Sequence, residues 1–450
     1  MESFVIKTPC SSANIGPGFD VIGLALSVYL ELHVTIDRSK TRSEHPLNCR
    51  VTYEGQGEGS DDISLDPQNN LITRVALYVL RCHDQRSFPV ETHVHIKNPI
   101  PLGRGLGSSG AAVVAGVQLG KEVGKLHHLT QERLFDYCLM IERHPDNVGA
   151  ALFGGFVGTY LMPLKPEDAS RVEVPLSEVL PNPAGGVDTG KRPPEPPNGI
   201  GHHIKFPWNK EIKAVAIIPD FIVPTHDARA VLPPNYQRTD VVFNLQRIAL
   251  LPVALGQSPP DPELINLAMQ DRVHQPYRQT LIPGLNEIVQ SMSPKTTPGF
   301  LGVCLSGAGP TILALAVSNF EDIANQIIAT LRKHNEKKDL ACQWLVLEPA
   351  EGTHLNGHEF ALLLHNPSIH NDGLNIRGRR VQDNCCHGVF FSSTDHAGAK
   401  AIKDDNVGQF AFFERSKLIL HADGFRATNG TEPKDFLHGQ GEMLWHFACL

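Results

Sequence analysis

Two segments near the N-terminus alternate apolar and polar residues at every second position. Tyr29–Ile36 and Glu91–Ile96 both follow this period, which is typical of strands that bury one face. Asn70–Leu80 and Gln131–Glu142 instead place their apolar residues at helical spacing, three and four positions apart. Residues 1–160 therefore predict strands that alternate with helices.

A comparable pattern returns in the second half of the chain. Lys213–Ile218 is a nearly continuous apolar run, which predicts a buried strand, and the runs Gly299–Leu305 and Ile312–Val317 read the same way. Phe320–His334 has the spacing of an amphipathic helix, and Ala341–Leu347 predicts a closing strand.

The segment between these two halves is rich in proline. Ten prolines lie between residues 163 and 207, where average usage would give about two. They include Pro193-Pro194-Glu195-Pro196-Pro197. Because proline cannot donate a backbone hydrogen bond, we expect a surface insertion or linker here that adds no element to a core.

The last hundred residues lose this periodicity. Nine of the 22 histidines lie in residues 351–450, but their spacing is irregular, which favours a loosely ordered extension over a metal site. We therefore divide the chain into an N-terminal domain (1–162), an insertion (163–210), a C-terminal domain (211–352) and an extension of unknown role (353–450).

Composition narrows the class of protein. The chain has 450 residues, of which 41% are hydrophobic, with a net charge of −8. This is ordinary for a globular protein, and the acidity argues against a nucleic-acid partner. We expect no membrane partner, because no apolar run approaches ~20 residues. The nine cysteines form no Cys-x-x-Cys pair, which favours a reducing compartment, and we expect a cytoplasmic location.

The strongest local motif is the loop Pro101–Ala112, which contains Gly103, Gly105, Gly107 and two serines. An apolar stretch follows it, so Ser108 or Ser109 would cap a buried helix. A glycine loop before a helix N-terminus suits a phosphate group. The loop has no lysine and is not a Walker A motif, and its match to a dinucleotide fingerprint lacks the acidic residue that should end a following strand.

Two other glycine-rich loops carry weaker signals. Pro9–Asp20 contains Asn14 and Asp20, which could offer an amide and a carboxylate to a ligand. Taken alone, each of them is better explained as a turn former. Ser306-Gly-Ala-Gly-Pro-Thr311, taken alone, is an ordinary turn between buried strands.

Taken together, the three loops resemble the three motifs of the GHMP kinases, which phosphorylate small alcohols. Glu142-Arg-His-Pro-Asp-Asn147, with Gly154-Gly155-Phe156, is similar to the homoserine kinase branch of that family. The segment Gln270-Asp-Arg-Val-His-Gln-Pro-Tyr-Arg278 also resembles this branch. The sequences of these motifs are most similar to those of its fungal members. The resemblance covers about residues 4–350.

The resemblance implies a two-lobed α+β fold. The N-terminal lobe would be like ribosomal protein S5 domain 2, and the C-terminal lobe ferredoxin-like. It also implies a homodimer that transfers the γ-phosphoryl group of ATP to the hydroxyl of L-homoserine, with Mg²⁺, as a step of threonine biosynthesis. One alternative is a GHMP kinase for another small alcohol. Another is a catalytically silent paralogue that senses metabolites, although Ser108, Ser109 and Glu142 are intact.

The resemblance also assigns residues to the nucleotide and the metal. Ser109 and Glu142 would hold Mg²⁺. Arg104 could contact phosphate or be a solvated charge beside the loop. The residues that would contact the nucleotide are Asn70, Pro101, Gly103, Arg104, Gly105, Leu106, Gly107, Ser108, Ser109 and Gly110.

The remaining assignments concern homoserine and catalysis. Asp20 would take the ammonium group, while Arg229 and Arg278 would clamp the carboxylate. Catalysis would involve Asp146, Asn147 and Arg229. Asp146 is either a general base or acts through Mg²⁺ or the Asn147 loop. The substrate-binding residues implied are Asn14, Asp20, His144, Asn147, Thr225, Arg229 and Arg278.

Overall fold

The N-terminal lobe is built on a seven-stranded sheet. The computed structural model describes residues 1–55, 62–163, 165–166, 192–335 and 339–360. The main strand order is β11-β1-β2-β4-β3, while β5 pairs with β2 and β6. All pairs are antiparallel except β3 with β4. The strands are β1 (Glu2–Ala13), β2 (Ile22–Asp37), β3 (Cys49–Gly55), β4 (Glu91–Asn98), β5 (Phe156–Leu161), β6 (Gly201–Phe206) and β11 (His354–Phe360).

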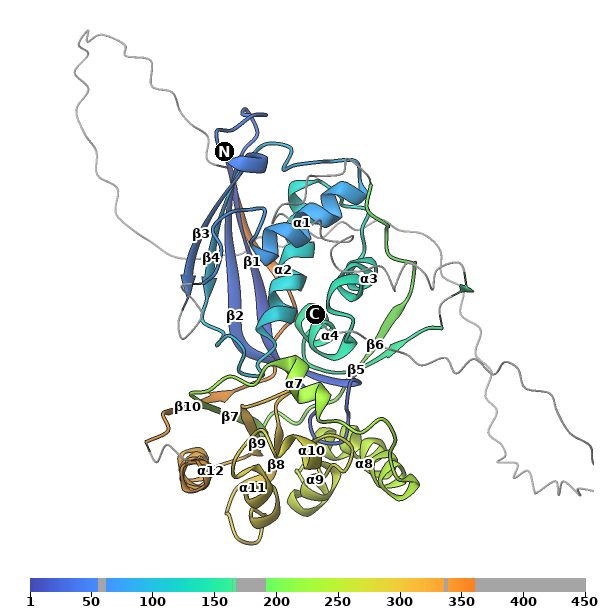
Figure 1. Ribbon diagram of the computed structural model, residues 1–450, viewed down its shortest axis with the longest axis vertical. Coiled ribbons are helices and arrows are strands. Elements are labelled where there is room, and N and C mark those ends of the chain that lie inside the picture. Colours follow the sequence, from blue (N-terminus) through green and yellow to red (C-terminus); the bar gives the residue numbers. More distant parts are fainter. Residues whose placement is uncertain (56–61, 164, 167–191, 336–338, 361–450) are drawn as a thin grey trace, which may run out of the picture. The chain divides into compact units, whose positions relative to one another are not determined.

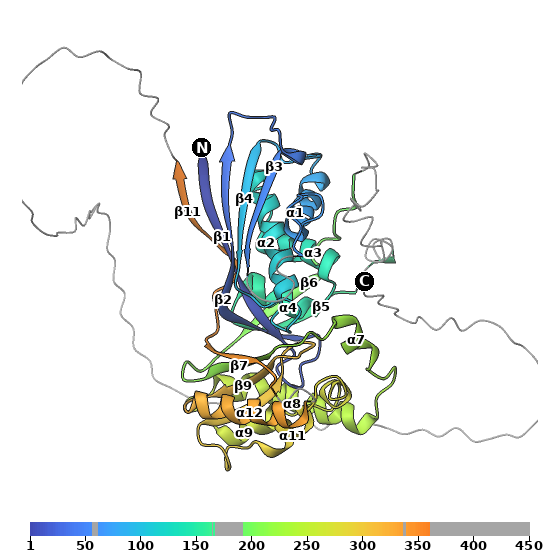
Figure 2. The same ribbon diagram turned by 60° about the vertical axis from the view of Figure 1, so that its left-hand side comes forward.

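Among the described residues, the helices α1 to α4 cover one face of this sheet (Figure 2). β2 and β4 alternate buried and half-buried residues along their paired segments, which confirms the two strands expected from period-two patterning. The helix α2 is buried along most of its length, as its apolar composition predicts. The helices are α1 (Leu71–Cys82), α2 (Ser108–Val123), α3 (Gln131–Glu142) and α4 (Pro145–Phe153), with a short 3-10 turn at Pro46–Asn48.

The C-terminal lobe contains a four-stranded antiparallel sheet in the order β10-β7-β9-β8. Its β-α-β-β-α-β succession is ferredoxin-like, and so the expected two-lobed α+β fold is confirmed (Figure 1). The strands are β7 (Lys213–Pro219), β8 (Phe300–Leu305), β9 (Ile312–Ala316) and β10 (Cys342–Leu347). The helices are α7 (Thr225–Ala230), α8 (Arg238–Gly256), α9 (Pro262–Ala268), α10 (Gln275–Arg278), α11 (Leu285–Ser291) and α12 (Phe320–His334).

The two lobes share a hydrophobic core. The largest buried cluster joins residues of β1 and β2, such as Ile6 and Leu32, to residues of the C-terminal lobe, such as Ala214 and Leu313. Burial of apolar surface on both sides resists separation of the lobes. Within the residues that the structure describes, no helix is both long and apolar enough to cross a membrane.

The proline-rich segment is only partly an insertion, because residues 192–206 belong to the N-terminal lobe. β6 pairs with β5 along its whole length. The carboxylate of Asp136 accepts hydrogen bonds from the N–H groups of residues 199–201 at 2.9–3.3 Å. Tyr78 donates to the carbonyl oxygen of Pro194 at 2.8 Å. The expectation that this segment adds nothing to a core is therefore wrong for residues 192–206, whereas residues 167–191 lie outside the described part.

The expectation that an extension of unknown role begins at residue 353 is wrong for residues 353–360. β11 returns to the N-terminal lobe and pairs with β1. Thr353 is buried and donates to the carbonyl oxygen of Ala151 at 2.9 Å and to Thr8 Oγ1 at 3.2 Å. The folded unit thus includes β11, while the rest of the expected extension, residues 361–450, lies outside the described residues.

Candidate active site

A cavity of about 180 Å³ lies where the three glycine-rich loops meet. It gathers nearly every residue that the motifs single out, together with parts of α4, α7 and α10. Its lining comprises Ala13, Asn14, Asp20, Pro101, Gly103–Gly110, Glu142, His144, Asp146, Asn147, Ile222–Thr225, Arg229, Arg278 and Gly307–Gly309.

The three loops form one hydrogen-bonded unit. Ser306 Oγ donates to the carbonyl oxygen of Gly105 at 2.6 Å and contacts Ser12 Oγ at 2.8 Å. The N–H of Gly307 donates to the carbonyl oxygen of Ala13 at 3.2 Å. Residues near positions 12, 105 and 306 therefore fix one another's backbone, and the loops are more than separate turns.

Gly105 shows why this junction requires glycine. Its φ is +81°, a left-handed conformation that glycine adopts without steric cost. A Cβ atom there would lie 2.5 Å from the carbonyl oxygen of Ser306 and 2.9 Å from that of Gly309. Only a residue without a side chain lets the loops Pro101–Ala112 and Ser306–Thr311 approach this closely.

The N-terminus of α2 opens into the cavity. Its N-cap is Gly107, at φ +64° and ψ +28°, and Ser108 is the first helical residue. The expectation of a serine cap is therefore wrong. Glycine has no side chain to accept from the first backbone N–H groups, which remain available with the positive end of the helix dipole. The geometry suits a phosphate anion.

Two oxygen-bearing side chains stand beside this helix terminus. Ser109 Oγ donates to Glu142 Oε2 at 3.1 Å, which joins α2 to the end of α3. Burial raises the pKa of the Glu142 carboxyl, while the hydroxyl of Ser109 opposes that shift. A carboxylate and a hydroxyl are hard oxygen donors of the kind that Mg²⁺ prefers.

Arg104 is not a solvated surface charge. It is only 5% exposed, and its guanidinium donates to the carbonyl oxygen of Pro219 and to the carboxylate of Asp220, both at 2.9 Å. The N–H of Thr311 also donates to the carbonyl oxygen of Arg104 at 3.2 Å. Arg104 thus ties the loop Pro101–Ala112 to β7 and to the loop Ser306–Thr311.

Asp20 and Arg229 form a bidentate ion pair across the cavity. Arg229, on α7, donates to the two carboxylate oxygens of Asp20 at 2.8 and 3.1 Å. The loop between β1 and β2 presents Asp20 through left-handed residues, since Asn14 and Asp20 both have positive φ and the N–H of Asp20 donates to Asn14 Oδ1 at 3.1 Å. Asn14 and Asp20 are therefore both turn formers and cavity residues.

Asp146 is a buried carboxyl of the cavity with a strongly raised pKa. It is 2% exposed, near the N-terminus of α4. Burial, with the nearby charge of Asp20, raises its pKa to about 7, although the N–H of Asn147 donates to it at 2.7 Å. Asn147 Oδ1 in turn accepts from Ser11 Oγ at 2.9 Å. The carboxyl of Asp146 can therefore exchange a proton near neutral pH.

His144 precedes α4 and stays neutral. Burial, reinforced by the positive charge of Arg229, lowers its pKa to about 4. A neutral imidazole can donate or accept a hydrogen bond from a ligand without bringing a second charge into the cavity.

Asn70 is the one expected site residue that does not line the cavity. It is the N-cap of α1, where its side chain accepts from the N–H of Ile72 at 3.1 Å and donates to the carbonyl oxygen of Ser64 at 3.0 Å. Its hydrogen-bonding groups are thus used in folding. Asparagine before a predicted helix is a preferred cap, a signal that was available in the sequence.

Sequence reasoning did not assign two lining segments. Ile222–Pro224 lies in the connection between β7 and α7, and Gly307–Gly309 belongs to the third loop. The third loop was recognised as a motif, but without a side chain to assign. The segment Ile222–Pro224 has no local sequence signal, because its position depends on how β7 packs against the loop Pro101–Ala112.

Comparisons with known proteins place the chain in a family. The family described as "GHMP kinases N terminal domain" matches residues 70–155, and "GHMP kinases C terminal" matches residues 255–337. Homoserine kinase of Saccharomyces cerevisiae is 57% identical over 352 residues, which cover 78% of this chain and 97% of that protein. Homoserine kinase of Candida albicans is 51% identical over 341 residues, 75% of this chain and 94% of that protein.

The fold has a solved counterpart. The crystal structure of homoserine kinase from Cytophaga hutchinsonii superposes with a TM-score of 0.57, covering 79% of this chain and 97% of that one at 24% sequence identity. At that identity the likeness concerns the two-lobed fold.

Proposed function

Because this chain belongs to the homoserine kinases of the GHMP kinase family, we propose that the cavity at the N-terminus of α2 is its active site. The enzyme transfers the γ-phosphoryl group of ATP to the side-chain hydroxyl of L-homoserine and gives O-phospho-L-homoserine and ADP, a step of threonine biosynthesis. One observation carries the proposed site: a phosphate-binding helix terminus and the charges that an amino acid requires line the same cavity.

The ATP phosphates would bind along Gly103–Gly110. The backbone N–H groups at the start of α2 would donate to phosphate oxygens, and Arg104 would hold the loop in place through Pro219 and Asp220. Since the transition state of phosphoryl transfer is loose, such positioning and charge neutralisation supply much of the catalysis.

Homoserine would replace the internal ion pair. In the structure Arg229 is bound to Asp20. A zwitterionic amino acid can satisfy both partners, with its ammonium at Asp20 and its carboxylate at Arg229 and Arg278. Asp20 and Arg229 would each exchange one ionic partner for another, so neither protein charge is left unpaired when the substrate binds. Asn14, His144, Asn147 and Thr225 would then surround the substrate from the loop, from α4 and from α7.

The residues beside α2 fit a magnesium ion. Glu142 is a carboxyl whose pKa burial has raised, and its hydrogen-bond partner is the hydroxyl of Ser109. A divalent cation would compensate the buried charge and complete the oxygen donor set. We propose that Ser109 and Glu142 hold Mg²⁺, which would neutralise the phosphate charge when bound.

Two roles remain open for Asp146. With a pKa of about 7 it could accept the hydroxyl proton of homoserine as phosphoryl transfer proceeds. It could alternatively position the Asn147 loop or the magnesium ion. Arg229 lies close enough to lower the pKa of Asp146 and so favours its charged form.

We further propose a cytoplasmic homodimer with no nucleic-acid or membrane partner. Six cysteines of the described part are free thiols, which supports a reducing compartment. Val242, Leu245 and Val253 on α8 are 45–65% exposed, an apolar surface that supports association with another protein chain.

Phosphorus NMR tests the site directly. With ATP, Mg²⁺ and L-homoserine, the wild-type chain should produce one phosphomonoester signal together with ADP. Glu142→Gln should raise the Mg²⁺ concentration needed for half-maximal rate by ~10-fold or more, because an ionic ligand is replaced by a neutral amide. An unchanged Mg²⁺ requirement in that variant would remove Glu142 from the metal site.

A further inference from the structure

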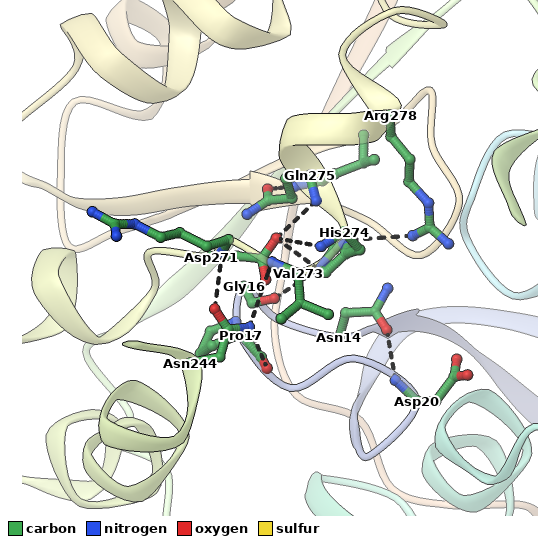
Figure 3. Close-up of polar contacts among 12 residues, drawn as sticks. Asn14, Gly16, Pro17, Asp20, Asn244, Asp271, Val273, His274, Gln275 and Arg278 are labelled. Carbon is green, nitrogen blue, oxygen red and sulfur yellow. Dashed lines mark hydrogen bonds and ion pairs between the residues drawn. The ribbon is translucent and has the colours of Figure 1, made fainter. Parts of the chain in front are cut away.

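A buried polar network lies behind Arg278 and is centred on Asp271 (Figure 3). The Asp271 side chain has no exposed surface. It accepts from Asn244 Nδ2 at 2.7 Å and from the backbone N–H groups of residues 273–275 at 2.7–3.0 Å. Asp271 therefore holds the start of α10, the single helical turn that ends with Arg278.

His274 links this turn to the glycine-rich loop Pro9–Asp20. Its side chain is fully buried, and Nε2 lies 2.8 Å from the carbonyl oxygen of Gly16. Since a carbonyl oxygen only accepts, Nε2 must carry the proton. In the neutral ring Nδ1 is then an acceptor, and it receives Arg278 Nη1–H at 3.2 Å. Burial lowers the pKa of His274, which favours this neutral ring.

Arg278 is held on one side by these contacts. Nη1 also donates to the carbonyl oxygen of Gly307 at 2.9 Å, and Nε donates to that of Ala228 at 3.0 Å. Within the described part of the chain, no hydrogen bond engages Nη2, so this nitrogen remains for a ligand in the cavity that Arg278 lines.

His274 also packs on the loop that presents Asp20. Its ring stacks on Phe19 with centroids 5.3 Å apart and an interplanar angle of 27°. The guanidinium groups of Arg278 and Arg229 lie 5.3 and 5.6 Å from the centre of the Phe19 ring. One histidine therefore contacts both the carboxylate side and the ammonium side of the amino-acid site.

We propose that His274 is a positioning residue that fixes the distance between the Arg278 guanidinium and the Asn14–Asp20 loop, and thereby sets the affinity for the carboxylate of the substrate. This inference rests on the proposed function of the cavity. His274 does not line the cavity and touches no reacting atom, so it acts on substrate binding and leaves phosphoryl transfer and ATP binding unchanged.

The decisive comparison uses two substrates. L-Homoserine carries the carboxylate, whereas 3-aminopropan-1-ol keeps the ammonium and hydroxyl groups without it. His274→Phe keeps an aromatic ring on Phe19 but removes both ring nitrogens. We expect a ~10–100-fold rise in KM for L-homoserine from the loss of two buried hydrogen bonds, with KM for ATP unchanged. The kcat/KM for 3-aminopropan-1-ol should stay within about twofold of wild type.

Two further variants keep the test valid even if His274→Phe does not fold. His274→Asn retains an acceptor for Arg278, and His274→Gln retains a donor for Gly16, so each should restore part of the affinity for L-homoserine. His354→Phe is the matched control. His354 contacts the carbonyl oxygen of Gly352 at 2.9 Å and the ring of Tyr29, outside the cavity, and its replacement should leave both KM values unchanged.

Other outcomes would overturn the inference. An equal loss with both substrates in every folded His274 variant, or a raised KM for ATP, would indicate a general structural role. A wild-type KM for L-homoserine in His274→Phe would leave no role in positioning. If instead the wild-type chain released no ADP with L-homoserine, the proposed function itself would fail, so the two failures are distinguishable.

Discussion

Asp146 combines the burial, charge and position that matter most for the chemistry of the cavity. It is buried near the N-terminus of α4, and desolvation together with Asp20 holds its pKa near 7, whereas the N–H of Asn147 stabilises its charged form. It can therefore change its protonation state near neutral pH.

The pH dependence of turnover follows from that pKa. If Asp146 accepts a proton, the carboxylate is required, so kcat/KM for L-homoserine should fall about tenfold per pH unit below pH 7. Asp146→Asn should lose ~10²–10⁴-fold in kcat and lose this acidic limb. Steady-state rates between pH 5.5 and 9 measure both effects. Nearly full turnover in the variant would exclude the role as general base.

Asp146 should also make the stability of the protein depend on pH, but stability should fall as the pH rises, whereas activity should fall as the pH is lowered. The folded-state pKa lies above the ordinary value of 3.8, so its protonated form is favoured, and stability is lost as the pH rises from about 4 through 7. Without ligands, Asp146→Asn should therefore gain in Tm relative to wild type at pH 8 and not at pH 4. Calorimetry at both values checks this, and equal differences would contradict it.

Asn70 and Arg104 show what residue-level prediction misses. The motifs single out most of the residues that line the cavity, but they do not reveal which side chains are used in folding. Asn70 caps α1, and Arg104 is bonded to Pro219 and Asp220. The partners of Arg104 lie more than 100 residues away along the chain, outside the motif. The capping role of Asn70 is local and follows from its place before a predicted helix.

At the scale of elements, the essential feature is that the three glycine-rich loops contact one another beside the cavity. Each loop taken alone predicts a turn, since glycine, asparagine and proline explain it locally. Their mutual hydrogen bonds, such as Ser306 Oγ to the carbonyl oxygen of Gly105, appear only when both lobes are folded. The resemblance to a family identified all three loops as motifs, but neither the motifs nor the spacing of residues shows which loops are in contact.

A pair of glycines tests the closeness of this junction. Gly105→Ala would place a Cβ 2.5 Å from a backbone oxygen, whereas Gly155, with a similar positive φ of +74°, has nothing within 4 Å of such an atom. Both substitutions should cost about 1 kcal/mol in free energy of unfolding for the left-handed backbone. Only Gly105→Ala should also raise KM for ATP by ~10-fold or more, because the phosphate loop must move.

Chemical denaturation and steady-state kinetics separate the two effects. Equal kinetic parameters in Gly105→Ala and Gly155→Ala would show that the junction tolerates a side chain and that the phosphate loop does not depend on it.

At the scale of the whole molecule, the two segments outside the expected lobes are partly structural. Residues 192–206 supply β6, and β11 closes the sheet beside β1. The sequence predicts neither element, because neither shows local periodicity. β6 lies in a proline-rich segment, and β11 is a short strand whose partner β1 lies more than 300 positions earlier in the chain. Prediction was best for long periodic elements such as α3 and α12, which begin and end where expected.

Shortened chains test the role of β11. A chain ending after Phe360, the last residue of β11, should keep wild-type activity. A chain ending after Glu351 should lose Tm by roughly 5–10 °C, because β1 becomes an edge strand and the buried hydrogen bonds of Thr353 are removed. Differential scanning calorimetry measures the difference. Equal Tm values would show that β11 contributes nothing to stability.

The most direct test compares alcohols as phosphate acceptors. With ATP and Mg²⁺, the wild-type chain should release ADP rapidly with L-homoserine and at background rates with mevalonate, galactose and shikimate, because only an amino acid can replace the ion pair between Asp20 and Arg229. A rate that does not depend on L-homoserine, or that is matched by any of the other three alcohols, would contradict the assignment of this cavity.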